Sequence, residues 1–207
     1  MSDKKGLNES ISTIFSALST KSRVVNISKG CFISINNIPE SECILLHRGY
    51  TFLRRTDDRL VIGNFNGPTV FGFNKYQNVC SNFFLEAMTD VEIEFIPSSV
   101  FFKEISNNNL WEPLLDVMMA LSAAMLRKNY DLSRHDSWSI IRWLLKDLNA
   151  EPDFIRDQIC VFDYIQQRTH LSRSGIMKYL SRLRKHHIIK MDKGRLVSIN
   201  GLPEALN

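Results

Sequence analysis

The sequence predicts an α+β protein built from an N-terminal β-roll, a long central helix and a C-terminal winged helix-turn-helix. Three observations predict it: evenly spaced β-type runs in the first half, helical periodicity near residues 112–130, and a helix–break–helix–hairpin pattern over residues 160–200. We expect a sensor-like roll over residues 1–108, a dimerisation helix over 109–132 and a winged helix-turn-helix over 133–207.

The first half combines one short helix with a series of strands. Residues 7–18 place apolar side chains on one helical face and predict an amphipathic helix. Short β-type runs follow, separated by Asn, Asp, Gly and Pro turn signals, at Cys31–Ile35, Cys43–His47, Tyr50–Arg54, Leu60–Gly63, Thr69–Phe73, Phe83–Ala87 and Val91–Ile96. This even rhythm is typical of an antiparallel barrel or roll.

A helix is predicted over Glu112–Tyr130, where Pro113 suits the first turn. Apolar side chains recur along it at spacings of three and four, namely Trp111, Leu114, Met118, Leu121 and Met125. This stripe fits the seam of a two-helix coiled coil and fits equally well a helix packed on the roll. On a monomer it would be an exposed apolar surface, so we expect a homodimer through residues 111–130.

The C-terminal part begins with a helix predicted from Asp136 to Leu148. A helix, a break at residues 170–172 and a second helix capped by Ser172 follow, and then two short strands meet at a turn over residues 192–194. In the second helix, Ile176, Leu180 and Leu183 form one apolar stripe that can pack on a core. This order of elements is a winged helix, which normally inserts its second helix into the DNA major groove.

Charge is concentrated on the same segment. Residues 168–195 hold nine Lys or Arg and one acidic residue, Asp192, although the whole chain carries only +4. A basic helix is often no more than a solvated surface. Here the helix break, cap, basic face and wing occur together in the right order, so double-stranded DNA is the expected partner.

Position along the winged helix assigns the expected contacts. Residues in the first turns of the second helix enter the groove, so base contacts are expected from Arg173, Ser174 and Lys178. Phosphate contacts are expected from Thr169, Ser172, Arg182, Lys193 and Arg195.

Composition argues against several other classes of protein. With 207 residues and 44% apolar content the chain can bury substantial cores, and no run approaches the roughly 18 apolar residues of a membrane span. The start, Met-Ser-Asp-Lys-Lys-Gly, has no apolar signal region, so a cytoplasmic protein is expected. The four cysteines, Cys31, Cys43, Cys80 and Cys160, lie far apart, which predicts no metal, no cofactor and no disulfide framework.

The order of elements resembles the Crp/Fnr superfamily of bacterial transcription regulators over nearly the whole chain. The segment Leu171-Ser-Arg-Ser-Gly-Ile-Met-Lys-Tyr-Leu-Ser-Arg-Leu-Arg184 is similar to the family's Ser-Arg-Glu-Thr-Val-x-Arg-x-Leu-x-x-Leu. The segments 164–174 and 191–203, with Phe71-Gly72-Phe73, resemble the small enterobacterial YaiV/IprA branch, which is named for inhibiting hydrogen peroxide resistance. The resemblance therefore implies a cyclic-nucleotide-binding-like roll and a link to the peroxide stress response.

The same resemblance shows what the roll lacks. Phe73 stands where nucleotide-binding members carry a ribose-binding Glu, and Cys80 stands near their phosphate-binding Arg. A buried phosphate without its counter-charge is unfavourable, so no binding of cyclic AMP or cyclic GMP is expected. Direct peroxide sensing by Cys80 is not favoured, because no basic residue adjoins it in the sequence to lower the pKa of the thiol. His47 is interpreted as a packed roll residue rather than a haem ligand.

Two residues depart from the family pattern in the DNA-binding segment. Ser174 replaces an acidic residue, which predicts a different base preference, and His170 stands where the turn usually has glycine. We expect a homodimeric transcription regulator that is not an enzyme, with RNA polymerase as a further candidate partner. The alternative is a protein-interaction module on a Crp-like dimer scaffold that does not bind DNA. A cysteine enzyme is disfavoured, since Cys160 and the His186-His187 pair lie in no nucleophile elbow.

Overall fold

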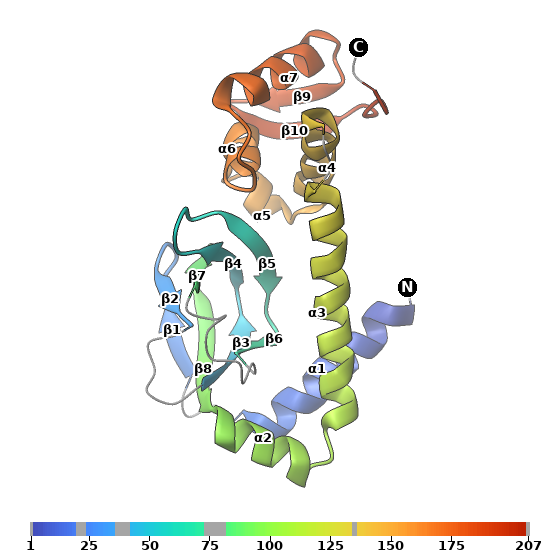
Figure 1. Ribbon diagram of the computed structural model, residues 1–207. Coiled ribbons are helices and arrows are strands. Elements are labelled where there is room, and N and C mark those ends of the chain that lie inside the picture. Colours follow the sequence, from blue (N-terminus) through green and yellow to red (C-terminus); the bar gives the residue numbers. More distant parts are fainter. Residues whose placement is uncertain (1, 20–23, 36–41, 73–81, 134–135, 206–207) are drawn as a thin grey trace. The chain divides into compact units, whose positions relative to one another are not determined.

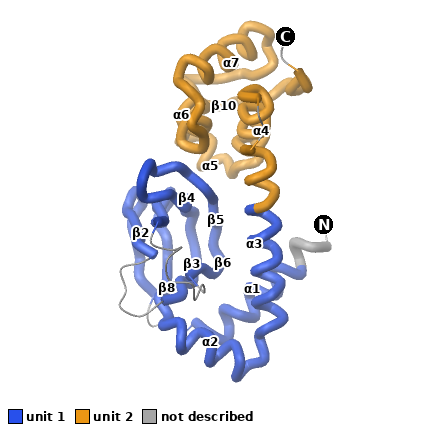
Figure 2. The backbone as a smooth tube through the Cα atoms, viewed as in Figure 1, with its two compact units in different colours: residues 1–125 blue, residues 126–207 orange. Residues whose placement is uncertain are grey.

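The computed structural model describes residues 2–19, 24–35, 42–72, 82–133 and 136–205, with side chains from residue 6 onward. It divides into two compact units, residues 1–125 and 126–207, and the boundary falls inside the longest helix (Figure 2). The fold class predicted from the sequence is confirmed (Figure 1). No helix of the described part is both long and apolar enough to cross a membrane.

The first unit is a two-sheet antiparallel roll with helices. Its elements are α1 Ser2–Leu18, β1 Val24–Ile27, β2 Phe32–Ser34, β3 Glu42–Arg48, β4 Tyr50–Arg55, β5 Val61–Asn66, β6 Thr69–Phe71, β7 Phe83–Ala87, β8 Val91–Pro97, α2 Ser98–Asn107 and α3 Trp111–Leu132, which continues into the second unit. The strands form two four-stranded sheets in the orders β1-β8-β3-β6 and β2-β7-β4-β5. All seven predicted strands are present, and their described ends agree with the prediction to within three residues. The predicted end Phe73 lies outside the described residues. Strand β1 and helix α2 were not predicted as separate elements.

Strand β3 explains why this unit has two apolar layers. Ile44 and Leu46 point into the interior of the roll, where they pack with residues of both sheets. Cys43 and Leu45 point the other way and join a cluster with α1, α2 and α3. Consecutive residues of a strand face opposite sides, so an apolar run is required where both faces are covered.

Helix α3 divides its apolar residues between two sides. Leu114 is 5% exposed and packs in the helical cluster, and Leu121 lies partly buried against the same cluster. Trp111, Met118 and Met125 are exposed. The single stripe inferred from the sequence is therefore not one surface: part of it packs on the first unit and part faces solvent.

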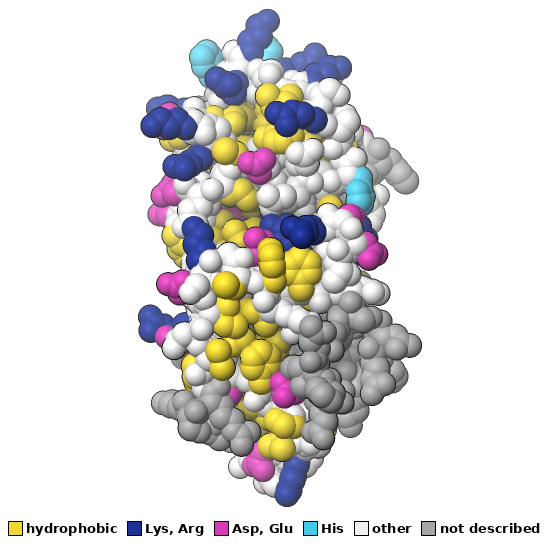
Figure 3. Space-filling view, turned by 90° about the vertical axis from the view of Figure 1, so that its left-hand side faces the viewer, with side chains coloured by type: hydrophobic (Ala, Val, Ile, Leu, Met, Phe, Trp, Pro, Cys, Tyr) yellow, Lys and Arg dark blue, Asp and Glu magenta, His cyan; other side chains and the backbone are white. Residues whose placement is uncertain are grey.

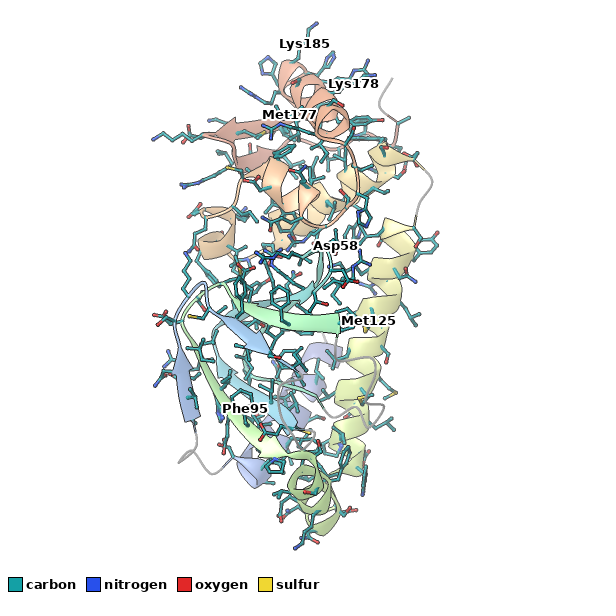
Figure 4. The ribbon with its side chains drawn as sticks, turned by 60° about the vertical axis from the view of Figure 1, so that its left-hand side comes forward. Asp58, Phe95, Met125, Met177, Lys178 and Lys185 are labelled. Carbon is teal, nitrogen blue, oxygen red and sulfur yellow. The ribbon has the colours of Figure 1, made fainter. Side chains whose placement is uncertain are left out.

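A wider apolar face is exposed on α3 than the sequence pattern suggested. Its large side chains are Trp111, Leu115, Met118, Met119, Met125, Leu126 and Tyr130. Leu115 is 57% exposed and Met125 is 69% exposed, the latter labelled in Figure 4. The opposite side of α3 is held to α1, where the Ser10 hydroxyl donates to Asp116 Oδ2 at 2.8 Å.

A buried polar group lies where α1 ends. Glu94 on β8 is 1% exposed and accepts a hydrogen bond of 2.8 Å from the Ser19 hydroxyl. His47 Nε2 lies 3.1 Å from the same carboxylate, and the His47 ring packs edge-on against Phe15. His47 is thus a packed roll residue, as the sequence interpretation expected.

The second unit combines helices with a two-stranded hairpin. Its elements are the end of α3, α4 Ser137–Ala150, α5 Asp153–Arg156, α6 Val161–Gln166, α7 Arg173–Lys185, β9 Ile189–Asp192 and β10 Arg195–Ile199. Asp136 caps α4, because its carboxylate accepts from the Ser139 amide at 2.7 Å. The predicted stripe Ile176, Leu180 and Leu183 is buried, so the apolar side of α7 packs inward and its polar side remains on the surface.

Candidate nucleic-acid interface

Helix α7 begins at a defined residue, as predicted. Ser172 has extended backbone angles, and its hydroxyl oxygen accepts a hydrogen bond of 3.1 Å from the Gly175 amide. The cap uses only the hydroxyl oxygen of Ser172, so its hydroxyl hydrogen can still be donated. The Ser174 hydroxyl, 3.3 Å away, is one group within reach, and either hydroxyl can be the donor between the two. The preceding His170 is not among the described residues with positive φ, which explains why the break needs no glycine here.

The three expected base-contacting residues lie on the exposed side of α7. Arg173, Ser174 and Lys178 are all exposed, and Figure 4 shows Lys178 and Lys185 projecting from this helix into solvent. Helix α7 contains no acidic residue. Its outward side can therefore approach an anionic surface without repulsion from the helix itself.

The hairpin β9–β10 forms a tight two-residue turn. Lys193 and Gly194 both have positive φ, 45° and 84°, as a type I′ turn requires. A Cβ on Gly194 would lie 3.0 Å from Cys160 Sγ, and the Gly194 carbonyl accepts from the Val161 amide at 2.8 Å. The wing is thus fixed to the start of α6, with the Lys193 side chain exposed at its tip.

The expected phosphate-contacting residues differ in their freedom to bind. Lys193 and Arg195 are exposed and Arg182 is half-buried. The Thr169 hydroxyl already donates to the Ile165 carbonyl at 2.9 Å. A phosphate contact by Thr169 would require that bond to break, so this residue has a local structural role in the structure.

One residue in the cationic segment is internal. Arg168 is 1% exposed, and its guanidinium lies 3.5 Å from the centroid of the Tyr164 ring. The sequence-based expectation that Arg168 adds to the surface charge of residues 168–195 is therefore wrong. The exposed cations of the segment are Arg173, Lys178, Arg184, Lys185, Lys190, Lys193 and Arg195. Lys and Arg side chains gather on the upper part of the view in Figure 3, which belongs to the second unit.

Arg168 and Tyr164 belong to a cluster of charged and polar groups inside the second unit. The Tyr164 hydroxyl donates toward Asp147 Oδ2 at 2.6 Å and Glu151 Oε1 at 2.9 Å, and burial raises the pKa of Tyr164. Burial and the Arg168 charge lower the pKa of Lys128, at the end of α3, to about 8. The cluster links α3, α4 and α6 within this unit.

An aromatic contact positions the first residue of α7. The Arg173 guanidinium carbon lies 4.8 Å from the centroid of the Phe162 ring, which comes from α6. Sequence reasoning missed Phe162, because an aromatic residue at the start of a short helix is most often part of the core. Its neighbours Val161, Tyr164 and Ile165 are buried while Phe162 is only half-buried, which distinguishes it.

Among the described cysteines, Cys43 is fully buried, which disfavours its thiolate form. Burial raises the pKa of Cys43 to about 12, and Cys31, Cys43 and Cys160 are free. Phe73 and Cys80, on which the expectation about cyclic nucleotides rests, lie outside the described residues. Within the described part, no three His, Cys, Asp or Glu side chains are grouped closely enough to hold a metal ion.

Comparison with known proteins defines the class first. Residues 137–204 match the family described as winged helix-turn-helix DNA binding. The fold matches the c-di-GMP-responsive global regulator CLP of Xanthomonas campestris, with a TM-score of 0.70 and 16% identity over 94% of this chain and 100% of that one. It also matches a CRP/FNR-family transcriptional regulator from Thermus thermophilus, with a TM-score of 0.61 and 16% identity over 84% and 93% of the two chains. The chain therefore has the Crp/Fnr fold.

Sequence similarity identifies the family within that class. The chain is 31% identical over 147 residues to the "Inhibitor of hydrogen peroxide resistance" of Salmonella typhimurium, which covers 70% of this chain and 71% of the relative. It is 33% identical over 108 residues to the protein of that name in Escherichia coli K12, about half of each chain. The chain belongs to the family of these proteins, as its resemblance to the YaiV/IprA branch predicted.

Proposed function

We propose that the chain is a homodimeric, sequence-specific DNA-binding transcription regulator. The observation that carries this proposal is the outward side of α7, which begins at a capped N-terminus, exposes Arg173, Ser174 and Lys178, and contains no acidic residue. The wing beside it adds Lys193 and Arg195. The match to a winged helix-turn-helix DNA-binding family supports the same function.

The proposed contacts follow from side-chain availability. Arg173, Ser174 and Lys178 read base edges, whereas Ser172, Arg182, Lys193 and Arg195 bind phosphate. Thr169 is kept only as a backbone support for the turn, because its hydroxyl hydrogen is already donated. The functional domains remain those expected from the sequence: a roll to residue 108, a dimerisation helix over 109–132 and the DNA-binding domain from residue 133.

The dimer is proposed to form through the exposed apolar face of α3. A second copy is the occupant favoured, because Trp111, Leu115, Met118 and Met125 occupy four of the five positions of a repeat with spacings of four and three, the pattern of a two-helix seam. The remaining position, 122, is a serine. In such a dimer the two copies of α7, one from each chain, would each read one half-site of the DNA. Leu114 and Leu121, which the sequence placed in the seam, are assigned to the core of the first unit.

The sequence and the named relatives also bear on the ligands, target genes and partners of the protein. Phe73 and Cys80 replace the nucleotide-binding Glu and Arg of the superfamily, so we propose that the protein binds neither cyclic AMP nor cyclic GMP. The peroxide-resistance name of its relatives suggests that its target genes belong to the oxidative stress response. RNA polymerase is proposed as a further partner, since a transcription regulator acts on that enzyme.

Salt dependence tests the DNA-binding function against protein docking. Three phosphate-binding cations in each chain, Arg182, Lys193 and Arg195, make six in a dimer. The logarithm of the association constant for random-sequence duplex should then fall with a slope of about −5 against the logarithm of salt concentration. Fluorescence anisotropy over a salt series measures this slope. A slope near zero, or no binding at low salt, would favour the protein-interaction module instead.

A further inference from the structure

The Arg173 side chain is held in place before any DNA is bound. Its guanidinium lies over the Phe162 ring at 4.8 Å, within the range of an attractive cation–π contact. Phe162 is the second residue of α6 and Arg173 the first of α7, so the contact joins the two helices of the helix-turn-helix. The ring lies half-buried beside Val161, Tyr164 and Ile165, which supply the core-facing side of α6.

We propose that Phe162 is a positioning residue that holds Arg173 in the conformation that reads a base pair; this inference rests on the proposed function. A ring can attract the guanidinium through its flat face, which carries no N–H donor. Because the N–H donors lie in the plane of the guanidinium, they then remain available for a bidentate contact with guanine O6 and N7. An aromatic ring can therefore orient Arg173 without competing with the base for its hydrogen bonds.

Preorganisation is the physical advantage of this arrangement. A long arginine side chain on the surface occupies many rotamers, and it must give up that freedom when it binds a base edge. A ring that already restricts Arg173 removes part of this cost before binding. The benefit concerns the base that Arg173 reads, so sequence preference should depend on Phe162 more than general affinity for DNA does.

The test needs a duplex that the wild-type protein prefers, obtained by selection from a randomised duplex library. Affinities for this duplex, for its single-base variants and for an unrelated duplex are measured for Phe162→Ala, Arg173→Ala and the double variant. Phe162→Ala should weaken binding to the preferred duplex roughly 2- to 10-fold. Preference should be lost at the base pair that depends on Arg173, while binding to the unrelated duplex stays unchanged. In the Arg173→Ala background, Phe162→Ala should have no further effect.

Two conservative variants separate stacking from packing. Phe162→Leu keeps an apolar side chain but has no ring face, so it should behave like Phe162→Ala even if the alanine variant folds poorly. Phe162→Tyr keeps the ring and should bind like wild type. Thermal unfolding of each variant checks the fold.

The outcomes distinguish this inference from the proposed function. If Arg173→Ala changes the base preference and Phe162→Leu does not, the positioning role is wrong and the function stands. A loss that is equal on all duplexes, or that persists without Arg173, also overturns the positioning role. If Arg173→Ala leaves every preference unchanged, the assignment of Arg173 as a base reader and the inference fail together.

Discussion

Ser172 has two separate tasks in the proposed interface. Its oxygen caps α7, and its hydroxyl hydrogen is the donor proposed for a phosphate. Ser172→Ala should lower the free energy of unfolding by about 1 kcal/mol through loss of the cap. Ser172→Asp keeps a capping oxygen, so stability should be retained while DNA affinity falls, because a carboxylate would face phosphate. Chemical denaturation and anisotropy measure the two effects. Undiminished DNA affinity of Ser172→Asp would show that this end of α7 does not approach the backbone.

Lys128 gives a pH-dependent prediction. Burial and the nearby Arg168 charge lower its pKa from 10.5 to about 8. Between these values the unfolded chain binds the proton and the folded chain does not, so the contribution of Lys128 to stability improves as pH rises through this window. Below it, the full cost of the buried charge applies. Lys128→Met should therefore raise the free energy of unfolding near pH 7 by about 1–2 kcal/mol.

The stabilising effect of Lys128→Met should shrink as the pH approaches about 10. Thermal unfolding of both proteins across the pH range measures the difference. A difference that is constant with pH would mean that the lysine keeps an ordinary pKa. Lys146, which is exposed on α4, gives the matched control variant Lys146→Met, which removes a lysine that is not buried.

Individual residues also show where sequence reasoning stops. The cap at Ser172 could be predicted, because a serine before an apolar-periodic segment has a local physical role. Arg168 could not be recognised as buried, since charge alone does not report the tertiary packing that places its guanidinium on Tyr164. The contact between Phe162 and Arg173 likewise depends on how two helices cross, which periodicity does not specify.

One substitution in the turn of the β9–β10 hairpin should change protein stability and DNA affinity in opposite directions. Lys193 occupies a left-handed conformation that asparagine adopts more readily, and Asn-Gly is the preferred type I′ turn. Lys193→Asn should raise the free energy of unfolding by up to about 1 kcal/mol. The same change should weaken binding to all DNA sequences alike, since it removes one proposed phosphate contact. Chemical denaturation should therefore show a higher free energy of unfolding, while anisotropy shows a lower affinity for DNA. An unchanged DNA affinity would mean that the wing does not contact DNA.

Elements with local sequence signals could be predicted, whereas elements that depend on tertiary packing could not. Alternating strands with strong turn signals, and the capped helices α4 and α7, could be predicted from local pattern. Helix α2 was missed because its Phe101 and Ile105 are buried by tertiary packing within a short segment rich in residues common in strands. In α3, both sides carry apolar residues, so spacing alone could not tell the side that packs in the first unit from the exposed side.

The exposed apolar face of α3 predicts that the complete protein is a dimer. Leu115→Glu places a charge in the proposed seam, so the dimer and the affinity for a preferred duplex should fall together, by at least 10-fold. Ala124→Glu is the matched control, because Ala124 is exposed on the same helix but outside the seam. Analytical ultracentrifugation measures the association. A monomeric wild type at micromolar concentration that bound its preferred duplex tightly would contradict the seam.

In the proposed dimer, two copies of α7 read DNA together. Selection of duplexes from a randomised library by the wild-type protein, followed by sequencing, tests this joint recognition. The expected product is an enriched palindrome whose half-site centres lie about 10 base pairs, one helical turn, apart. Arg173→Ala should lose preference at one position in each half-site. A library that shows no enrichment, or a preference that does not depend on any residue of α7, would refute joint recognition by two copies of α7.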